Sequence, residues 1–172
     1  MHVHSFAPIV GPSSRVLVLG SMPGQASLRA GEYYAHPRNL FWPLMDALLG
    51  VDRRQCYARR TAALLARGVA LWDVLETCTR ESSLDSDIVE SSIVANDLPG
   101  LLRASPSIRT LCFNGQRAAV AFRRHVLPHL DAPDLALHAL PSTSPANASV
   151  PYPRKLEAWR VVARAARPRG GA

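Results

Sequence analysis

Four short apolar runs in this 172-residue chain each lead directly into a polar or glycine-bearing stretch. The runs are RVLVLG (15–20), VALWDV (69–74), RTLCFN (109–114) and LALHALP (135–141). They are continuous and do not alternate with polar residues, which is typical of strands buried on both faces of a parallel sheet. We therefore predict a central, mainly parallel four-stranded sheet.

Segments with helical periodicity lie between and after these runs. They cover residues 39–50, 53–68, 92–105, 115–128 and 153–167. The first two are closed by a glycine, a common helix end, and Pro99-Gly100 interrupts the third. Strands that alternate with helices predict an α/β fold with helices on both faces of the sheet, a three-layer α/β/α sandwich.

The length of the chain favours one domain, residues 1–172, with an ordinary hydrophobic core. We expect its ends, 1–12 and 168–172, to be flexible and residues 77–87 to form a loop. No apolar run reaches the roughly 18 residues of a membrane span. The N-terminal sequence also lacks the pattern of a secretory signal, so we expect a cytoplasmic protein with no membrane partner.

The chain is strongly basic, with a net charge of +7 and a pI of about 10.2. A basic domain of this size commonly binds a polyanion, and nucleic acid is the leading candidate. The basic residues are dispersed and form no basic amphipathic helix, which makes a membrane surface the weaker alternative. His125 and His129 are four residues apart, but Pro128 intervenes and no glutamate completes a zinc-binding pattern, so we expect no metal.

The ends of the predicted strands indicate a binding site, because ligands of open parallel sheets bind at the carboxyl ends of the strands. The four stretches found there are GSMPG (20–24), WDVLETC (72–78), FNGQ (113–116) and LPSTSPAN (140–147). Glycines let a backbone approach a ligand closely, and hydroxyl groups can hold phosphate oxygens. Each stretch alone could be a turn or a cap. Together they predict one site.

The stretch YYAHPRNLFW (33–42) places aromatic, basic and amide side chains before an amphipathic segment. Tyr34 is the preferred stacking face for a flat ligand, since aromatic stacking accepts any base. Phe41 is a second candidate, although it suits a helix core equally well. His36 and Arg38 are candidates for phosphate contacts, with a solvated surface arginine as the alternative for Arg38.

Four motifs together resemble the hypoxanthine-DNA glycosylase branch of the uracil-DNA glycosylase superfamily. They are, in order, LGSMPGQASL, YYAHPRNLFWPLM, LCFNGQRA and LPSTSPANA, within a resemblance that spans about residues 15 to 165. The resemblance implies an α/β/α enzyme that removes deaminated bases from double-stranded DNA without a metal or cofactor. We expect it to be a monomer associated with the nucleoid.

The chain departs from other branches of that superfamily at two positions. Relatives carry Asp or Asn in the first loop, where this chain has Met22, to handle the attacking water. The resemblance implies that Asn39 takes over this task, with helix capping as the alternative role. Leu140 stands where other branches have a histidine that polarises a uracil carbonyl, which predicts weak uracil removal.

The expected site residues fall into three groups. Asn39 is the catalytic residue. The base-binding residues are Tyr34, Asp73, Asn114, Met22 and Phe41. The DNA-binding residues are Gly20, Ser21, Gly24, His36, Arg38, Ser142, Thr143, Ser144 and Asn147. Asp73 could accept the N1–H of hypoxanthine or cap a helix, and Asn114 could donate to the base or hold a neighbouring loop.

Three other functions remain open at this point. The closest is a uracil or mismatch glycosylase with a broader base range. A catalytically silent DNA-binding module would use the same basic cleft. A small-molecule nucleoside hydrolase would need clustered acidic metal ligands, which the motifs lack. No lysine lies in the four strand-end stretches, so we expect a monofunctional hydrolase without a lyase step.

Overall fold

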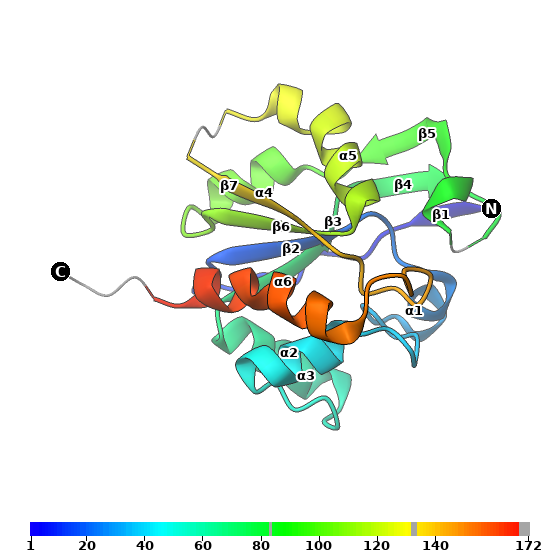
Figure 1. The fold of residues 1–172 in the computed structure, drawn as a ribbon. Coiled ribbons are helices and arrows are strands. Elements are labelled where there is room, and N and C mark those ends of the chain that lie inside the picture. The colour runs from blue at the N-terminus through cyan, green and yellow to red at the C-terminus, as the bar shows by residue number, and fades with distance from the viewer. Residues whose placement is uncertain (83, 132–133, 169–172) are drawn as a thin grey trace.

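The computed structural model of the chain describes residues 1–82, 84–131 and 134–168. Its central sheet has four parallel strands in the order β3-β2-β6-β7 (Figure 1). These strands are β2 (Val16–Gly20), β3 (Val69–Asp73), β6 (Thr110–Asn114) and β7 (Ala136–Leu140). All four predicted strands are confirmed, with ends that differ by no more than one residue.

Helices cover both faces of this sheet (Figure 1). One face is packed by α2 (Phe41–Leu49), α3 (Tyr57–Ala66) and α6 (Tyr152–Ala166), and the other by α4 (Leu98–Ala104) and α5 (Gln116–His125). The remaining helical segments are α1 (Gln25–Ala30) and the 3-10 turns η1 (Asp85–Asp87) and η2 (Leu127–His129). The three-layer α/β/α architecture is therefore confirmed.

Strand β2 shows why an uninterrupted apolar run is needed at the centre of the sheet. All of its residues are buried. Leu17 and Leu19 join the core under α4 and α5, while Val16 and Val18 join the core under α2, α3 and α6. Successive side chains of a strand point to opposite faces, so a strand covered on both sides must be apolar throughout.

A second sheet of three antiparallel strands was not predicted. It consists of β1 (His2–His4), β4 (Leu75–Thr79) and β5 (Val89–Ala95), in the order β1-β4-β5. The expectation of a loop over 77–87 is therefore wrong for residues 77–79. Polar residues interrupt β4, so no apolar run marks it.

The N-terminal segment, for which we predicted flexibility, is paired with the rest of the molecule. Residues 2–4 pair with β4, and the Met1 amino group donates to the Arg80 carbonyl oxygen at 2.9 Å. Ile9 forms a bridge with Leu71 of β3. These contacts join the segment to residues about 60 to 80 positions further along the chain. The expected flexible C-terminal end falls largely on residues 169–172, which lie outside the described part of the chain.

The helix predicted over 92–105 begins later than expected. Residues 92–95 belong to β5, and α4 starts only at Leu98. The Asp97 side chain caps this helix by accepting a hydrogen bond from the Gly100 N–H at 2.8 Å. Pro99 lies in the first turn, where a missing N–H leaves no hydrogen bond unmade. The proline therefore marks the start of the helix and not a break within it.

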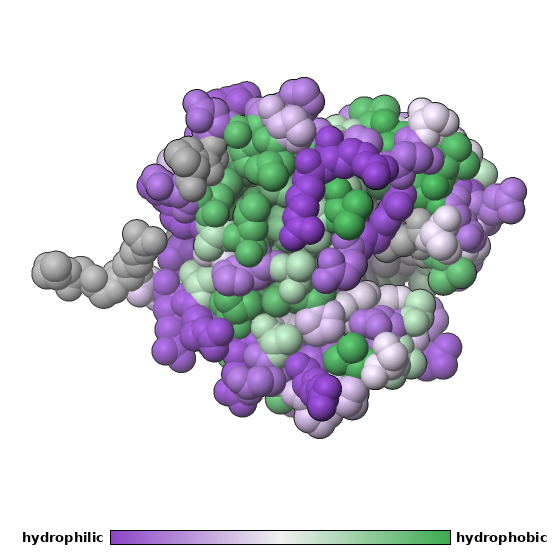
Figure 2. All heavy atoms as spheres, turned by 45° about the horizontal axis from the view of Figure 1, so that its top comes forward, coloured by the Kyte–Doolittle hydropathy of each residue, from purple (hydrophilic) through white to green (hydrophobic). Residues whose placement is uncertain are grey.

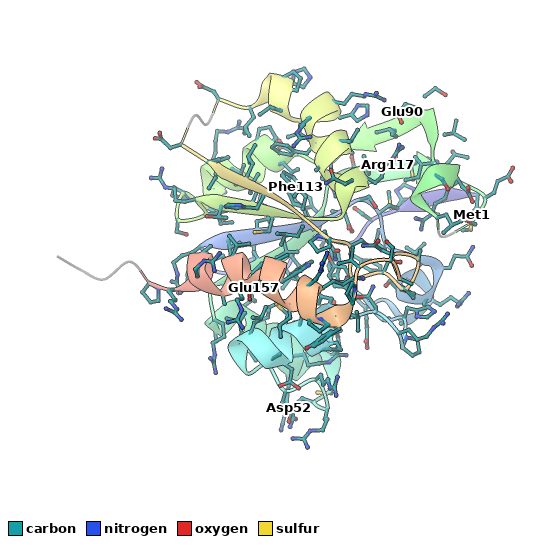
Figure 3. The ribbon with its side chains drawn as sticks, viewed as in Figure 1. Met1, Asp52, Glu90, Phe113, Arg117 and Glu157 are labelled. Atoms are coloured by element: carbon teal, nitrogen blue, oxygen red, sulfur yellow. The ribbon has the colours of Figure 1, made fainter. Side chains whose placement is uncertain are left out.

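Glu90 ties the small sheet to α5 (Figure 3). Its carboxylate accepts hydrogen bonds from Arg117 at 3.0 Å and from Arg124 at 2.6 Å, and it lies 3.1 Å from His125 Nε2. The bond from Arg124 is the main reason that the pKa of Glu90 is lowered. These contacts lie on the surface, where ion pairs add little to stability.

The outer surface carries both apolar and hydrophilic residues. On the face in Figure 2, apolar residues (green) lie between strips of hydrophilic ones (purple). Exposed large apolar side chains include Val120 in α5, Leu127 in η2 and Leu137 in β7. Among the described residues, no helix is both long and apolar enough to cross a membrane.

Candidate active site

A cavity of about 640 Å³ opens at the carboxyl ends of the parallel strands. Residues 20–24 after β2 and 142–147 after β7 form two of its walls, and Asp73 and Asn114 line it from the ends of β3 and β6. In Figure 1 these loops gather on the right, beside α1. The cavity has the size and position expected of a small-molecule or nucleotide site in an α/β sheet.

All but two of the predicted site residues line this cavity. Those that do are Asn39, Tyr34, Asp73, Asn114, Met22, Gly20, Ser21, Gly24, His36, Ser142, Thr143, Ser144 and Asn147. Residues up to about 125 positions apart in the sequence thus meet at one edge of the sheet. The convergence predicted from the strand ends is confirmed.

Phe41 and Arg38 lie outside the lining. Phe41 is fully buried and packs behind Tyr34, with ring centroids 4.1 Å apart and an angle of 26° between the rings. The expectation that Phe41 touches a base is therefore wrong, because Tyr34 covers it. Arg38 is exposed next to the cavity residues His36 and Asn39, and its phosphate contact stays a prediction.

Gly20 and Asp73 face each other across β2 and β3, where they are paired in register. Asp73 is buried, and a Cβ atom on Gly20 would stand 2.4 Å from its Oδ1 atom. Only glycine leaves room for this carboxylate at the floor of the cavity. The alternative of Asp73 as a helix cap is wrong, since β4 and not a helix follows it.

Asn114 clamps the loop that follows β7. Its Nδ2 atom donates to Thr143 Oγ1 and its Oδ1 atom accepts from the Thr143 N–H, both at 2.9 Å. Thr143 is fully buried. Gly115, at a φ of 97°, donates its N–H to the Leu140 carbonyl oxygen at 3.0 Å. Of the two roles open for Asn114, holding the neighbouring loop is the one observed.

Helix α6 also holds the loop that follows β7. Trp159 Nε1 donates to the Pro141 carbonyl oxygen at 2.9 Å, and Lys155 Nζ donates to that of Asn147 at 2.7 Å. Lys155 is buried, which lowers its pKa. Its position in the apolar-periodic segment 153–167 offered no signal for this role, because the partner is a backbone carbonyl from another part of the chain.

Asn39 lies where the loop 33–39 turns into α2. Its Oδ1 atom accepts a hydrogen bond from the Phe41 N–H at 2.9 Å, and its own N–H donates to the His36 carbonyl oxygen at 2.8 Å. The Leu40 N–H donates to the Thr143 carbonyl oxygen at 3.0 Å. The N-cap of α2 is Leu40, and the Asn39 side chain bonds the first N–H of the helix from the residue before it. This bond holds Asn39 in a defined orientation beside the clamped loop.

The His36 ring is oriented by the same turn. Its Nδ1 atom accepts a hydrogen bond from the Arg38 N–H at 3.1 Å. A neutral imidazole that accepts at one nitrogen carries its proton on the other. Nε2 is therefore a hydrogen-bond donor on a side chain that lines the cavity.

Three cavity residues lie outside every predicted motif, namely Arg29, Leu84 and Ser86. The other lining residues that were not singled out belong to the predicted stretches: Pro23, Gln25, Ala26, Ser27, Tyr33, Pro145 and Ala146. Arg29 is exposed on α1 and adds a positive charge at the cavity. Leu84 and Ser86 reach it from the connection between β4 and β5. Because that small sheet was not predicted, nothing in the sequence indicated that its connection would lie beside the site.

Metal ligands do not gather in the described ranges. Within 1–82, 84–131 and 134–168, no three His, Cys, Asp or Glu side chains lie close enough to hold a metal ion together.

An α/β/α domain with a polar cavity at the strand ends fits the protein class to which the motifs pointed. The sequence matches the family model of the uracil DNA glycosylase superfamily over residues 7–164. The match spans most of the chain, and the chain belongs to the uracil-DNA glycosylase superfamily.

Individual relatives agree with this membership. A protein named hypoxanthine DNA glycosylase from Methanosarcina acetivorans is 33% identical over 160 residues, which cover 92% of this chain and 96% of that protein. A second protein named hypoxanthine DNA glycosylase, from Methanosarcina barkeri, is 34% identical over 119 residues. These residues cover 69% of this chain and 74% of that protein. The resemblance to the hypoxanthine-DNA glycosylase branch is confirmed.

A solved structure agrees with the fold. It is a solution NMR structure of a Methanosarcina acetivorans protein assigned by name to the uracil DNA glycosylases. It superposes with a TM-score of 0.81 at 32% identity, and the match covers 96% of this chain and 99% of that one.

Proposed function

We propose that this protein is a monofunctional DNA glycosylase that flips a deaminated base, hypoxanthine before uracil, into the cavity and hydrolyses its N-glycosidic bond. One observation carries the proposal: in a chain of this superfamily, a single cavity brings together Asn39, the Asp73 carboxylate and the Tyr34 ring. The shared name of the relatives, hypoxanthine DNA glycosylase, supports the same substrate.

The water-orienting group is Asn39. Its carbonyl oxygen has two lone pairs, and the Phe41 N–H occupies one of them. The other can accept a hydrogen bond from water and direct that water at C1′ of the sugar. An amide does not titrate in the useful range, so Asn39 contributes by position and not as a strong base. The bond from the Phe41 N–H supports this role because it fixes the direction of the oxygen.

The base lies against the inner wall of the cavity. Asp73 accepts the N1–H of hypoxanthine, and the Tyr34 ring lies beside the purine. The Asn114 amide, one hydrogen of which is bonded to Thr143, lies beside the Tyr34 hydroxyl and is a further donor. Donors near the edge of the leaving purine stabilise the negative charge that develops as the glycosidic bond breaks.

The surrounding loops hold the DNA backbone. Ser142, Ser144 and the Gly24 backbone bind phosphate oxygens without reading sequence. Arg29 and Arg38 are exposed around the cavity and contribute charge. The net charge of +7 supports double-stranded DNA as the partner, and a hypoxanthine–thymine mispair reduces the cost of flipping. We expect a monomer that works on nucleoid DNA.

The choice of base tests the proposal. Leu140 is packed in the core where other branches have a histidine, so no group from that position polarises a uracil carbonyl. We expect single-turnover excision of hypoxanthine to exceed that of uracil by at least about tenfold, or 1.4 kcal/mol. Matched labelled duplexes carrying either base, followed by alkaline strand scission, give both rates. Equal rates would favour the broader uracil or mismatch glycosylase. Binding without scission would favour the silent DNA-binding module.

Replacing Gly20 with alanine is expected to lower hypoxanthine excision by about tenfold. The new Cβ would stand 2.4 Å from Asp73 Oδ1, so the carboxylate must move away from the base. Gly11→Ala is the matched control, because its Cβ would meet Leu65 at an ordinary 3.6 Å. Single-turnover rates and thermal melts of both variants check this. An unchanged rate for Gly20→Ala would mean that the position of Asp73 does not matter for excision.

A further inference from the structure

Tyr34 has an unusual backbone conformation that its surroundings maintain. Its φ is 58°, and among the described residues it is the one non-glycine with a positive φ. Hydrogen bonds hold both flanking peptides: Tyr33 N–H donates to Tyr57 Oη at 3.1 Å, and Ala35 N–H donates to Ser27 Oγ at 3.2 Å. Such strained residues persist where the structure over-determines them, often at ligand sites.

This conformation directs the Tyr34 side chain into the cavity floor. The ring is stacked on buried Phe41, which leaves it little freedom to turn. The hydroxyl oxygen at its tip is buried, and among the described residues no hydrogen bond of ordinary geometry reaches it, although the Asn114 side chain lies near enough to act as a donor to it. Buried polar groups are nearly always paired, and a donor such as Asn114 leaves the hydroxyl proton of Tyr34 without an acceptor. This proton therefore points to an acceptor that the ligand supplies.

The Tyr34 hydroxyl lies close to the Asp73 carboxylate. A Cβ atom on Gly20 would be 2.4 Å from Asp73 Oδ1 and 3.6 Å from Tyr34 Oη, so both oxygens border the same small space. Burial, and then the charge of Asp73, raise the pKa of Tyr34 far above its ordinary value. At neutral pH the hydroxyl therefore keeps its proton and can donate it.

The Tyr34 hydroxyl as donor and the Asp73 carboxylate as acceptor together match the base edge that deamination creates. Adenine and cytosine present an amino group next to a ring nitrogen with a lone pair. Deamination turns this edge into a carbonyl next to an N–H, so the donor and the acceptor exchange places. A carboxylate faces the N–H favourably and the lone pair unfavourably. A hydroxyl group that donates its proton pairs with the carbonyl oxygen and not with an amino group.

We propose that the Tyr34 hydroxyl and the Asp73 carboxylate together read this carbonyl/N–H edge, with Tyr34 donating to the carbonyl and Asp73 accepting from the N–H. Tyr34 is then a residue that determines specificity, and the substrate class is bases that carry the lactam edge left by deamination. The inference rests on the proposed glycosylase function. Guanine and thymine share the edge, and their stable pairing makes them costlier to flip.

The test combines removal of the Tyr34 hydroxyl with replacement of the base carbonyl oxygen that it would contact. Duplexes carry a 2′-fluoro-arabino nucleotide, which slows cleavage, with either hypoxanthine or 6-thiohypoxanthine as the base. Sulfur accepts hydrogen bonds weakly, while the N1–H facing Asp73 remains. We expect Tyr34→Phe to weaken binding of the hypoxanthine duplex about tenfold and of the thio duplex less than about twofold.

Tyr33→Phe is the matched control, because the Tyr33 hydroxyl already donates to the Ala7 carbonyl oxygen at 3.3 Å. It should change both affinities by the same factor. An equal loss on both duplexes for Tyr34→Phe, or no loss on either, overturns the reading role of the hydroxyl. If wild-type protein also releases no base from natural hypoxanthine DNA, the proposed function itself fails. Release by wild type with an equal loss in Tyr34→Phe removes only the inference about Tyr34.

Discussion

Asn39→Ala is expected to lower single-turnover excision of hypoxanthine by a factor of roughly one hundred or more, because loss of a positioned water-orienting group commonly costs that much. DNA affinity should change little. Since Asn39 also accepts the Phe41 N–H, the variant should lose about 1 kcal/mol of stability as well. Single-turnover rates measured beside thermal melts separate the two effects.

Asn39→Ser isolates the hydrogen bond to the Phe41 N–H. A serine oxygen can accept this bond as asparagine does but is too short to hold water at the same place. We expect it to restore stability without restoring excision. Met22→Ala should cost mainly packing, since Met22 is buried in the core and a thioether cannot activate water. If Asn39→Ala keeps near-normal excision, the site assignment is wrong and the first loop must be reconsidered.

Asp73→Ala is expected to lower hypoxanthine excision by about tenfold to one hundredfold, since a hydrogen bond to a charged group is worth about 1.5–3 kcal/mol. Binding to DNA that already contains an abasic site should remain nearly intact, because no base is there to be read. The excision rate and the affinity for abasic DNA are measured on the same preparation. Loss of abasic-site binding as well would mean that Asp73 is structural.

The central sheet was predictable because its strands are buried on both faces and therefore show continuous apolar runs. The small sheet was not, because β4 and β5 carry polar residues on exposed positions and β1 has only three residues. β1 pairs with β4 from more than 70 residues away, and β5 follows β4 through residues 80–88 and not through a short turn, so neither pairing leaves a clear local signal. The same reason explains why the N-terminal segment was expected to be flexible.

The cavity residues were predictable because polar and glycine-bearing stretches follow directly on predicted strands. What the sequence could not indicate is how the side chains face. Phe41, the first residue of α2, is buried in the core. Asn39, two residues before it, lines the cavity. Lys155 and Trp159 support the last loop through backbone carbonyls, a contact that depends on how α6 packs and not on either residue's type.

Release of free base from natural substrate tests the central claim most directly. Wild-type protein in molar excess is mixed with a duplex that carries one hypoxanthine opposite thymine, and the free base is quantified by chromatography. We predict close to one hypoxanthine released per duplex, together with an abasic site that alkali cleaves. A duplex that is bound, yields no free base and stays intact in alkali would contradict the account.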